Sequence, residues 1–381
     1  MAMCGSQTAR FDTICSFALF LEYVTVTYVR ILSLGGKIFA VIGTIANQLY
    51  STTTAVLYPQ QPETSFFTQL KNLYMEDSIQ ATDPRDRIFA VMGLQTHSGD
   101  TQIIVDYAKP WTDIYRECME IWIQQFGLST LGYCCWADHA DQSLVSWVID
   151  WRQLYALPIG RSVPTAPFSA SGSSQHLTNI CFPRLGCLRV SGFVVDIVKS
   201  TGRVGRNRKR ERSFEDYLKW MAELTSLIAT LGVTAPLDLT KEQKEEILWK
   251  TAIADCIFAG GVGERRAEAA DLQMYQAFHR LIHSKELDSD RRVSYGYRVS
   301  LKLAQDARRP FIAPKGYIGI GPRHCQAGDL ICIFIGAPTP FIVRKAGTKG
   351  EYHLVGDAYV HGIMDGELMK GNPQTESFDL V

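Results

Sequence analysis

The sequence lacks an excess of either charge, because 39 lysines and arginines balance 39 aspartates and glutamates over 381 residues. A chain without net charge has no general attraction to nucleic acid or to an anionic membrane, so either partner would need a local patch. The sequence also lacks a hydrophobic run of the roughly 20 residues that a membrane-spanning helix needs. The mostly apolar stretch 14–21 ends at Glu22, and the uncharged stretch 38–61 contains several Ser, Thr and Gln residues. We therefore expect a cytoplasmic protein, with the nucleus as the alternative compartment, that does not act at a membrane.

A cysteine pattern that would indicate a disulfide framework is also missing. The ten cysteines are scattered over the chain, Cys134 and Cys135 are adjacent, and there is no Asn-x-Ser/Thr glycosylation site. These features are typical of reduced thiols in the cytosol. With 46% hydrophobic and 20% charged residues, the chain can bury a sizeable core, and its length is typical of two or three domains.

The sequence contains no complete motif for metal binding or nucleophilic catalysis. His279 and His283 have the spacing of a zinc-binding helix, but the glutamate and the third ligand of such a site are missing. Cys134, Cys135 and His139 lie close together without the paired-cysteine spacing of zinc sites, and we interpret the two cysteines as buried structural thiols. We therefore predict no catalytic residue, no bound metal and no cofactor, and we interpret the chain as a protein that is not an enzyme.

The most informative segment that is present contains the signals of a short, well-capped helix. Asp83 can cap a helix whose first residue is Pro84, and Asp86 faces the positive end of that helix. An apolar face and a final glycine follow. Capping and burial leave Arg85 and Arg87 unexplained, and we expect their guanidinium groups to pair with carboxylates of a neighbouring element.

The hydrophobic periodicity changes from a helical spacing to short runs separated by Gly and Pro near the C-terminal end. We therefore predict an α+β fold, with helix-rich N-terminal and middle regions and a small antiparallel β-sheet or barrel at the C-terminal end. The predicted parts are an apolar N-terminal segment (1–63), a helical region (64–156), a linker (157–187), a mainly helical region (188–308), a β module (309–369) and a tail (370–381).

Individual elements follow from the same patterns. The predicted helices are 64–80, 84–92, the segment between Pro110 and Gly127, a helix opened by Ser213, 240–258 and 265–287. The predicted strands are 103–105, 188–197, 311–313, 317–320, 330–335, 341–344 and 352–361. The run 330–335 is apolar on both faces and should be a central strand, and Gly356 should mark a bulge or bend.

One local basic patch is present, a loop with six cationic side chains in ten residues: Arg203, Arg206, Arg208, Lys209, Arg210 and Arg212. Such a run is sufficient for nuclear import or for contacts with phosphate groups, although it contains no aromatic residue for base stacking. We interpret it as a solvated loop and keep a nucleic-acid partner as the alternative. The glycine-rich run 260–263 lacks the Gly-Lys-Ser/Thr of a phosphate-binding loop.

Several motifs resemble, in the same order, segments of fungal heterokaryon incompatibility (HET) domain proteins. Asp-Pro-Arg-Asp at 83–86, Ser-Trp-Val-Ile-Asp-Trp at 146–151 and the segments after residue 315 are similar to the family's post-core and C-terminal regions, and 249–255 resembles a weaker segment between them. The residues that carry the resemblance are Asp83, Pro84, Arg85, Asp86, Trp147, Asp150, Trp151, Gly328, Asp329, Gly356, Tyr359, His361, Gly362, Asp365 and Gly366.

The resemblance implies a role in non-self recognition during hyphal fusion, and in the cell death that follows incompatible fusion, through contacts with other proteins. HET cores also resemble TIR-type signalling domains, some of which cleave NAD. The core segments of the family are not found in the 82 residues before Asp83, so we expect a truncated relative or an incomplete gene model. The alternatives are a remnant of an NAD-cleaving signalling protein, a nucleic-acid-associated regulator that uses the loop 203–212, and a nonfunctional fragment.

Overall fold

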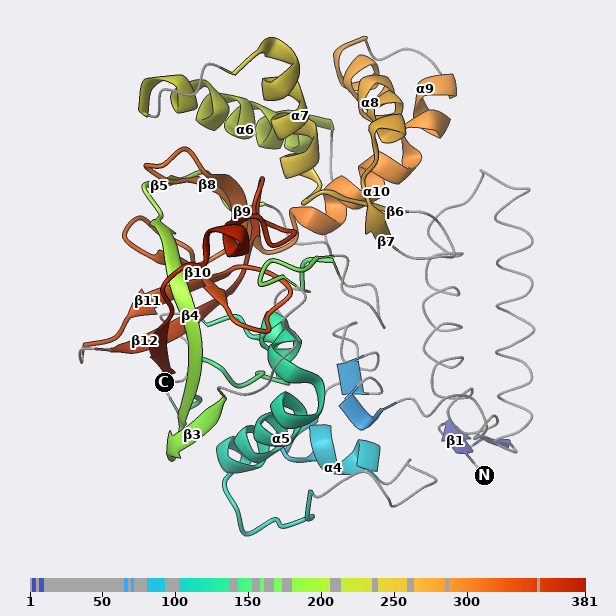
Figure 1. Ribbon diagram of the computed structural model, residues 1–381. Helices are drawn as coiled ribbons and strands as arrows, with labels where there is room; N and C mark the ends of the chain where they lie inside the picture. The colour runs from blue at the N-terminus through green and yellow to red at the C-terminus, as the bar shows by residue number, and fades with distance from the viewer. Residues whose placement is uncertain are drawn as a thin grey trace. The chain divides into compact units, whose positions relative to one another are not determined.

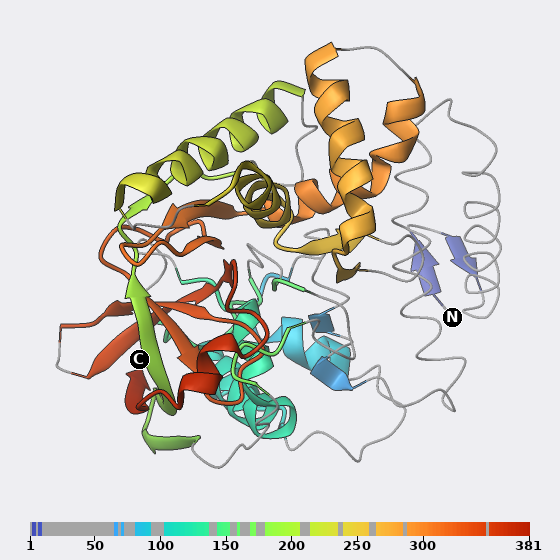
Figure 2. The same cartoon turned by 45° about the horizontal axis from the view of Figure 1, so that its top comes forward.

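The described part of the chain divides into two compact units, one within 1–114 and 151–153 and the other within 115–150 and 154–381. Its elements are drawn in Figure 1 and Figure 2. The computed structural model describes residues 2–4, 7–9, 65–67, 70–71, 81–92, 103–136, 143–152, 158–160, 168–172, 180–205, 214–234, 239–258, 264–284, 288–347 and 350–381.

The smaller unit contains a two-stranded sheet of β1 (Ala2–Cys4) and β2 (Gln7–Ala9), the helix α4 (Asp86–Met92), and the beginning of α5 (Trp111–Phe126). The predicted helix after Pro110 is confirmed as α5, whose apolar stripe is buried along the helix at Ile114, Cys118 and Trp122. Gly127 ends it with a φ of 71°, a conformation that glycine adopts without steric cost.

The other described helices belong to the larger unit. They are α6 (Phe214–Thr234), α7 (Lys241–Ala252), α8 (Leu272–Ser284), α9 (Asp288–Val293) and α10 (Tyr295–Ala304), with short 3-10 turns at Gly127–Tyr133, Ala269–Asp271 and Glu367–Gly371. The predicted acidic first turn of α6 is confirmed at Glu215 and Asp216. α7 begins with a capping box, because Thr240 accepts a bond from the backbone of Gln243 and the Gln243 side chain bonds back. None of the helices that the structure describes combines the length and low charge that a bilayer-spanning helix needs.

Five strands of the larger unit close into a barrel in the order β10, β11, β12, β14, β4 and back to β10. All neighbours in this ring are antiparallel except β12 and β14, which are parallel. The strands are β4 (Cys187–Ile197), β10 (Leu330–Phe334), β11 (Phe341–Lys345), β12 (Glu351–Asp357) and β14 (Glu376–Leu380), and β3 (Cys181–Arg184) extends the sheet beside β4. The predicted α+β class with a C-terminal barrel is therefore confirmed.

The barrel is filled by side chains rather than open. The Phe334 ring of β10 lies 5.4 Å from the ring of Phe341 in β11 and 5.4 Å from the ring of Phe378 in β14. Since β10 and β14 are not neighbours in the ring, the latter contact crosses the interior. β10 is buried at every residue and pairs on both sides, so the predicted central strand is confirmed.

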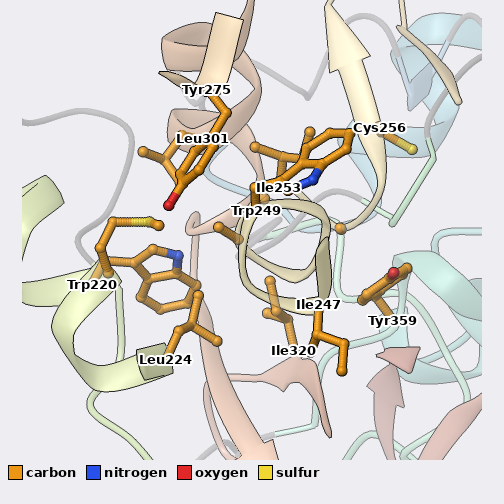
Figure 3. Close-up of a cluster of buried hydrophobic side chains, with 14 of the residues drawn as sticks. Trp220, Leu224, Ile247, Trp249, Ile253, Cys256, Tyr275, Leu301, Ile320 and Tyr359 are labelled. Carbon is orange, nitrogen blue, oxygen red and sulfur yellow. The ribbon is translucent and has the colours of Figure 1, made fainter. Parts of the chain in front are cut away.

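A second, four-stranded antiparallel sheet has the order β13 (Tyr359–Val360), β9 (Ile318–Pro322), β8 (Arg308–Ile312) and β5 (Ser200–Thr201). Its apolar side chains share one buried cluster with the helices, in which Trp220 of α6 and Trp249 of α7 lie near Ile320 of β9 and Tyr359 of β13 (Figure 3). The short hairpin of β6 (Cys256–Phe258) and β7 (Glu264–Arg266) lies beside α10.

Two predicted helices in the middle region are shorter than expected. The segment 240–258 is helical only to Ala252, because Ala254 and Asp255 adopt left-handed conformations with φ of 51° and 53° and turn the chain into β6. The segment 265–287 begins as β7 and becomes helical at Leu272. The apolar residues of both segments have the spacing of a helix. The end of the first segment and the start of the second nevertheless form strands, because β6 and β7 pair with each other.

Two strand predictions and the predicted tail also need correction. The segment 103–105 forms no strand, and no described strand pairs with it. The segment 352–361 is divided into β12 of the barrel and β13 of the second sheet, with the predicted bulge at Gly356, whose φ is 146°. The segment 370–381, expected to be a tail, contains β14, which pairs with both β4 and β12. Of the predicted N-terminal segment 1–63 and helix 64–80, most residues lie outside the described ranges.

Candidate functional site

The Asp-Pro-Arg-Asp motif forms the turn that leads into α4, which begins at Asp86 rather than at Pro84 as predicted. The Asp83 carboxylate accepts a hydrogen bond from the backbone N–H of Arg85 at 2.9 Å, the contact of a helix-capping side chain. The Arg85 guanidinium pairs with the same carboxylate at 2.7 Å, not with a neighbouring element as predicted. Hydrogen bonds from Arg85 hold the pKa of Asp83 below its usual value.

The motif also fastens the segment 103–110 to α4, which the sequence did not indicate. The Arg85 guanidinium donates to the carbonyl oxygens of Tyr107 and Lys109, the latter at 3.1 Å. The Tyr107 hydroxyl donates to the Asp86 carboxylate at 2.5 Å, and its ring packs edge-on against Phe89 at 5.1 Å. The polar groups of the motif are therefore engaged in local structure.

The Ser-Trp-x-x-Asp-Trp segment forms turns, not a helix, and Trp147 is fully buried in the larger unit. The Trp147 indole N–H donates to the Gly186 carbonyl at 3.1 Å. The Ser146 hydroxyl accepts from the backbone N–H of Leu354 at 2.8 Å and donates to the main-chain oxygen of Val381. These bonds attach the segment to the barrel. Trp151 belongs to the smaller unit, where its ring packs against the ring of Phe67.

A buried ion pair that the sequence did not reveal joins the two sheets. Arg308 of β8 donates from Nη2 to Asp357 Oδ1 at 2.6 Å, and each side chain is only 3% exposed. The second carboxylate oxygen of Asp357 accepts from the backbone N–H of Ile159 at 2.7 Å. Nearby, burial raises the pKa of the Cys135 thiol to about 11, and burial also raises the pKa of the Cys134 thiol well above its usual value. Both thiols are therefore protonated at neutral pH, which agrees with our interpretation of them as structural.

The motif residues Gly328 and Asp329 form the turn before β10. Asp329 is 1% exposed and accepts two bonds from the guanidinium of Arg344, at 2.8 and 3.1 Å, as well as one from the Gln326 backbone. The Arg344 guanidinium also lies over the Trp136 ring at 5.2 Å. This pair holds the turn against β11 and leaves no exposed carboxylate for a ligand.

The most accessible polar motif residue within the described ranges is Asp365, which follows β13 and contacts other polar side chains. We define the motif cluster as Tyr359, His361 and Asp365 together with Asp255 and Arg266. The Arg266 guanidinium bridges the two carboxylates, at 2.6 Å from Asp255 Oδ2 and 2.6 Å from Asp365 Oδ1. The Tyr359 hydroxyl lies 3.1 Å from His361 Nδ1. The Asp365 side chain is half exposed, whereas that of Asp255 is 6% exposed.

Burial sets the charge states of the motif cluster. It lowers the pKa of His361 to about 4, with help from the nearby Lys250 and Arg266 cations, and it raises the pKa of Tyr359 well above its usual value. The imidazole and phenol are therefore both neutral at pH 7, so the Tyr359 hydroxyl can donate to His361 Nδ1. Burial also raises the pKa of Asp255, against the opposing effect of Arg266.

The two ion pairs of Arg266 connect the β6–β7 hairpin to the segment after β13. The Arg266 guanidinium donates hydrogen bonds to two carboxylates and lies 4.6 Å from the centre of the Phe168 ring. These contacts occupy the guanidinium, so it is not oriented to polarise a substrate. The sequence indicated the motif residues and the 249–255 segment that ends in Asp255, but nothing singled out Arg266. The separation of 99 residues between Arg266 and Asp365 explains why no local pattern could reveal it.

The remaining candidate sites are only partly described. Within the described ranges, no group of three or more His, Cys, Asp and Glu side chains is arranged to hold a metal. The rings of His279 and His283 stack at 4.2 Å, with His283 Nδ1 2.9 Å from the His279 carbonyl oxygen. His139, residues 206–212 of the basic loop and the run 260–263 lie outside the described residues. Arg203 lies near Glu223, at 3.4 Å.

The filled barrel and the ion pairs that attach neighbouring segments to it form a structural domain. Comparison with known proteins identifies the class of this domain. Residues 285–381 match the family model of the Het-6 β-barrel domain. This range contains α9, α10 and most of the barrel, whereas β4, which closes the ring, precedes it in the sequence.

The chain is also similar to heterokaryon incompatibility protein 6, OR allele, of Neurospora crassa, with 26% identity over 379 aligned residues. The alignment covers 85% of this chain and 54% of that protein, so the chain spans about half the length of the curated relative it matches. No solved structure matches. The two matches confirm the resemblance to heterokaryon incompatibility proteins that was found in the sequence.

Proposed function

We propose that this protein acts in heterokaryon incompatibility, as an interaction or signalling protein in non-self recognition and in the cell death that follows incompatible fusion. The observation that carries the proposal is the similarity to a heterokaryon incompatibility protein over 85% of the chain. The polar motif residues pair with one another inside the fold, which supports a structural role for them rather than a catalytic one. The proposed compartment is the cytoplasm, with the nucleus as the alternative.

The proposal can be tested in a filamentous fungus that carries the gene. Two strains that differ only in the allele at this locus are fused, and the viability of the fused cells is compared with that of fusions between identical strains. We expect death only in the mixed fusions, and we expect deletion of the gene from one strain to restore viability. Equal survival of the mixed and matched fusions, for every natural allele pair, would contradict the proposal.

The proposed absence of enzymatic activity has a separate test. Purified protein is incubated with NAD, and nicotinamide release is measured against a heat-denatured sample. We expect equal release from both samples. Release that exceeds the denatured control, and that a point substitution in this chain abolishes, would instead favour the alternative of an NAD-cleaving signalling protein.

A further inference from the structure

The corner formed by α9 and α10 carries a group of positively charged side chains. We define the basic corner as Arg291, Arg292, Tyr295, Arg298 and Lys302. No ion pair joins its four cations to an acidic side chain among the described residues, although the larger unit otherwise pairs its arginines extensively. Those paired arginines include Arg184, Arg189, Arg265, Arg266, Arg280, Arg308 and Arg344.

The two cations of α10 lie on the same face of the helix as Tyr295. On α10, the positions of Tyr295, Arg298 and Lys302 are three and four residues apart and therefore lie on one face of the helix. The opposite face is buried and includes Tyr297 and Leu301. Among the side chains of α9 and α10 whose exposure is described, the exposed ones include the cations Arg291, Arg292 and Lys302 and no carboxylate. These cations favour an anionic partner.

Hydrogen bonds within the protein fix the positions of α9 and of the Arg298 side chain. Arg298 donates from Nη2 to the carbonyl oxygen of Arg291 at 3.0 Å, which fixes its guanidinium across the junction of the two helices. The buried Asp290 carboxylate accepts two bonds from Arg280 of α8, at 2.9 and 3.2 Å, and so anchors α9. A rigid arrangement of charges loses less entropy when it binds a ligand. Figure 2 shows α9 beside α8.

The side chains between the cations indicate which kind of anion fits. Tyr295 is 57% exposed, so its side chain is accessible to a ligand. Nucleic-acid bases stack on exposed aromatic rings, while guanidinium groups pair with phosphates. Only Val293 adds a further large apolar side chain to this exposed surface, so there is little area to insert into a lipid interface. An acidic peptide would offer carboxylates but no base to stack on the ring.

We propose that the basic corner binds single-stranded nucleic acid, with phosphates on the cations and a base stacked on Tyr295. This surface differs from the basic loop at 203–212, and the proposal does not depend on the role in incompatibility. Because each phosphate contact releases a counterion, four contacts give a slope of about −3 in a plot of log affinity against log salt concentration.

The test measures binding of a short fluorescein-labelled oligothymidylate to the full chain by fluorescence anisotropy over a series of salt concentrations. In Arg291→Ser/Arg292→Ser, we expect the slope to be halved and the affinity to fall by at least about tenfold at moderate salt. The matched control is Lys241→Ser/Lys244→Ser, which removes two exposed cations from α7 and should leave both quantities unchanged.

Two substitutions of Tyr295 test whether a base stacks on its ring. Tyr295→Ala should weaken binding by about tenfold, and Tyr295→Phe should retain it, because the phenyl ring still offers a face for the base. Circular dichroism melts of all variants establish that they fold. Absence of saturable binding by the unsubstituted protein, or equal binding by Arg291→Ser/Arg292→Ser and the control, would overturn the proposal. Tighter binding to phosphatidylserine vesicles or polyglutamate than to the oligonucleotide would overturn it in favour of a lipid or protein partner.

Discussion

At the scale of single residues, charges inside the fold mostly stabilise contacts between segments far apart in sequence. Arg308 and Asp357 join the second sheet to the barrel, and Arg266 joins Asp255 to Asp365. A buried ion pair is not by itself evidence of high stability, because desolvation offsets much of the attraction between the charges. Removal of one partner is nevertheless costly, because the other charge remains buried alone.

Arg308→Met should therefore lower the free energy of unfolding by about 3–5 kcal/mol, whereas Arg308→Met combined with Asp357→Leu should cost less than the two single substitutions together. The measurement is a urea titration followed by circular dichroism. Lys219→Ala, which removes a partner from the exposed Lys219–Glu215 pair, is the control and should change stability by less than about 1 kcal/mol. A similarly small effect of Arg308→Met would show that the buried pair is dispensable.

His361 gives the fold a predictable sensitivity to acid. Its pKa falls from 6.5 to about 4 on folding, so between these values the unfolded chain binds a proton that the folded protein does not. The contribution of the neutral imidazole to stability is complete above pH 6.5, and is lost as pH falls toward 4, by at most about 3 kcal/mol.

Urea titrations at several pH values between 4 and 7.5 test this expectation. His361→Asn should flatten the dependence of stability on pH in this range, because asparagine can accept from Tyr359 without titrating. His283→Asn, on the exposed surface of α8, should retain the dependence. Identical pH profiles for His361→Asn and the unsubstituted protein would mean that other groups cause the acid sensitivity.

At the scale of elements, the closure of the barrel depends on a close approach between the backbones of β4 and β10. β4 meets β14 and β10 around Gly192, which pairs with Phe334 on one side and with Glu376 on the other. A Cβ atom at Gly192 would lie 2.5 Å from the carbonyl oxygen of Ile333, closer than van der Waals contact allows. Closure of the ring therefore requires glycine at this position.

Gly192→Ala should destabilise the barrel by about 1–3 kcal/mol, because the strands must separate to admit a methyl group. Thermal unfolding followed by circular dichroism measures the effect. Gly347→Ala is the matched control, since nothing lies within 4 Å of the position of its Cβ atom. Equal melting temperatures for the two variants would contradict the inferred packing between β4 and β10.

At the scale of the whole larger unit, the barrel is assembled from distant parts of the chain. β4 begins at Cys187 and β14 ends at Leu380, yet the two strands pair along five residues. The C-terminal segment is thus an integral strand, and Phe378 fills the interior with no exposed surface. β14 lies between β4 and β12 and pairs with both. Without β14, these two strands would each have an unpaired edge.

Deletion of residues 376–381 should therefore open the ring and abolish the cooperative unfolding transition of the barrel. Phe378→Ala is a milder change and should lower the free energy of unfolding by about 3–5 kcal/mol, as expected when a buried aromatic ring is removed. Glu376→Ala, at an exposed position of the same strand, is the control. A deleted protein that melts like the full chain would show that β14 is peripheral.

The sequence by itself determined the class of the fold and many of its elements. Helical spacing before Gly127 and the apolar run 330–335 predicted α5 and β10, because these segments bury their own periodic faces. The order of motifs indicated the family. Short-range signals were reliable where local chemistry decides the structure, as at the Asp83 cap and the Gly356 bulge.

Only the tertiary structure decided which strands close the barrel and which charges meet. The predicted strand 352–361 is divided between two sheets because its first part pairs with β11 and its last part pairs with β9. The expected tail becomes β14 because β4 and β12 provide backbone partners for it. Such contacts depend on pairing across the fold, and no periodicity within one segment encodes them. For the same reason the motif cluster could be named in part from the sequence, but Arg266 became visible only when the hairpin of β6 and β7 placed it between two carboxylates.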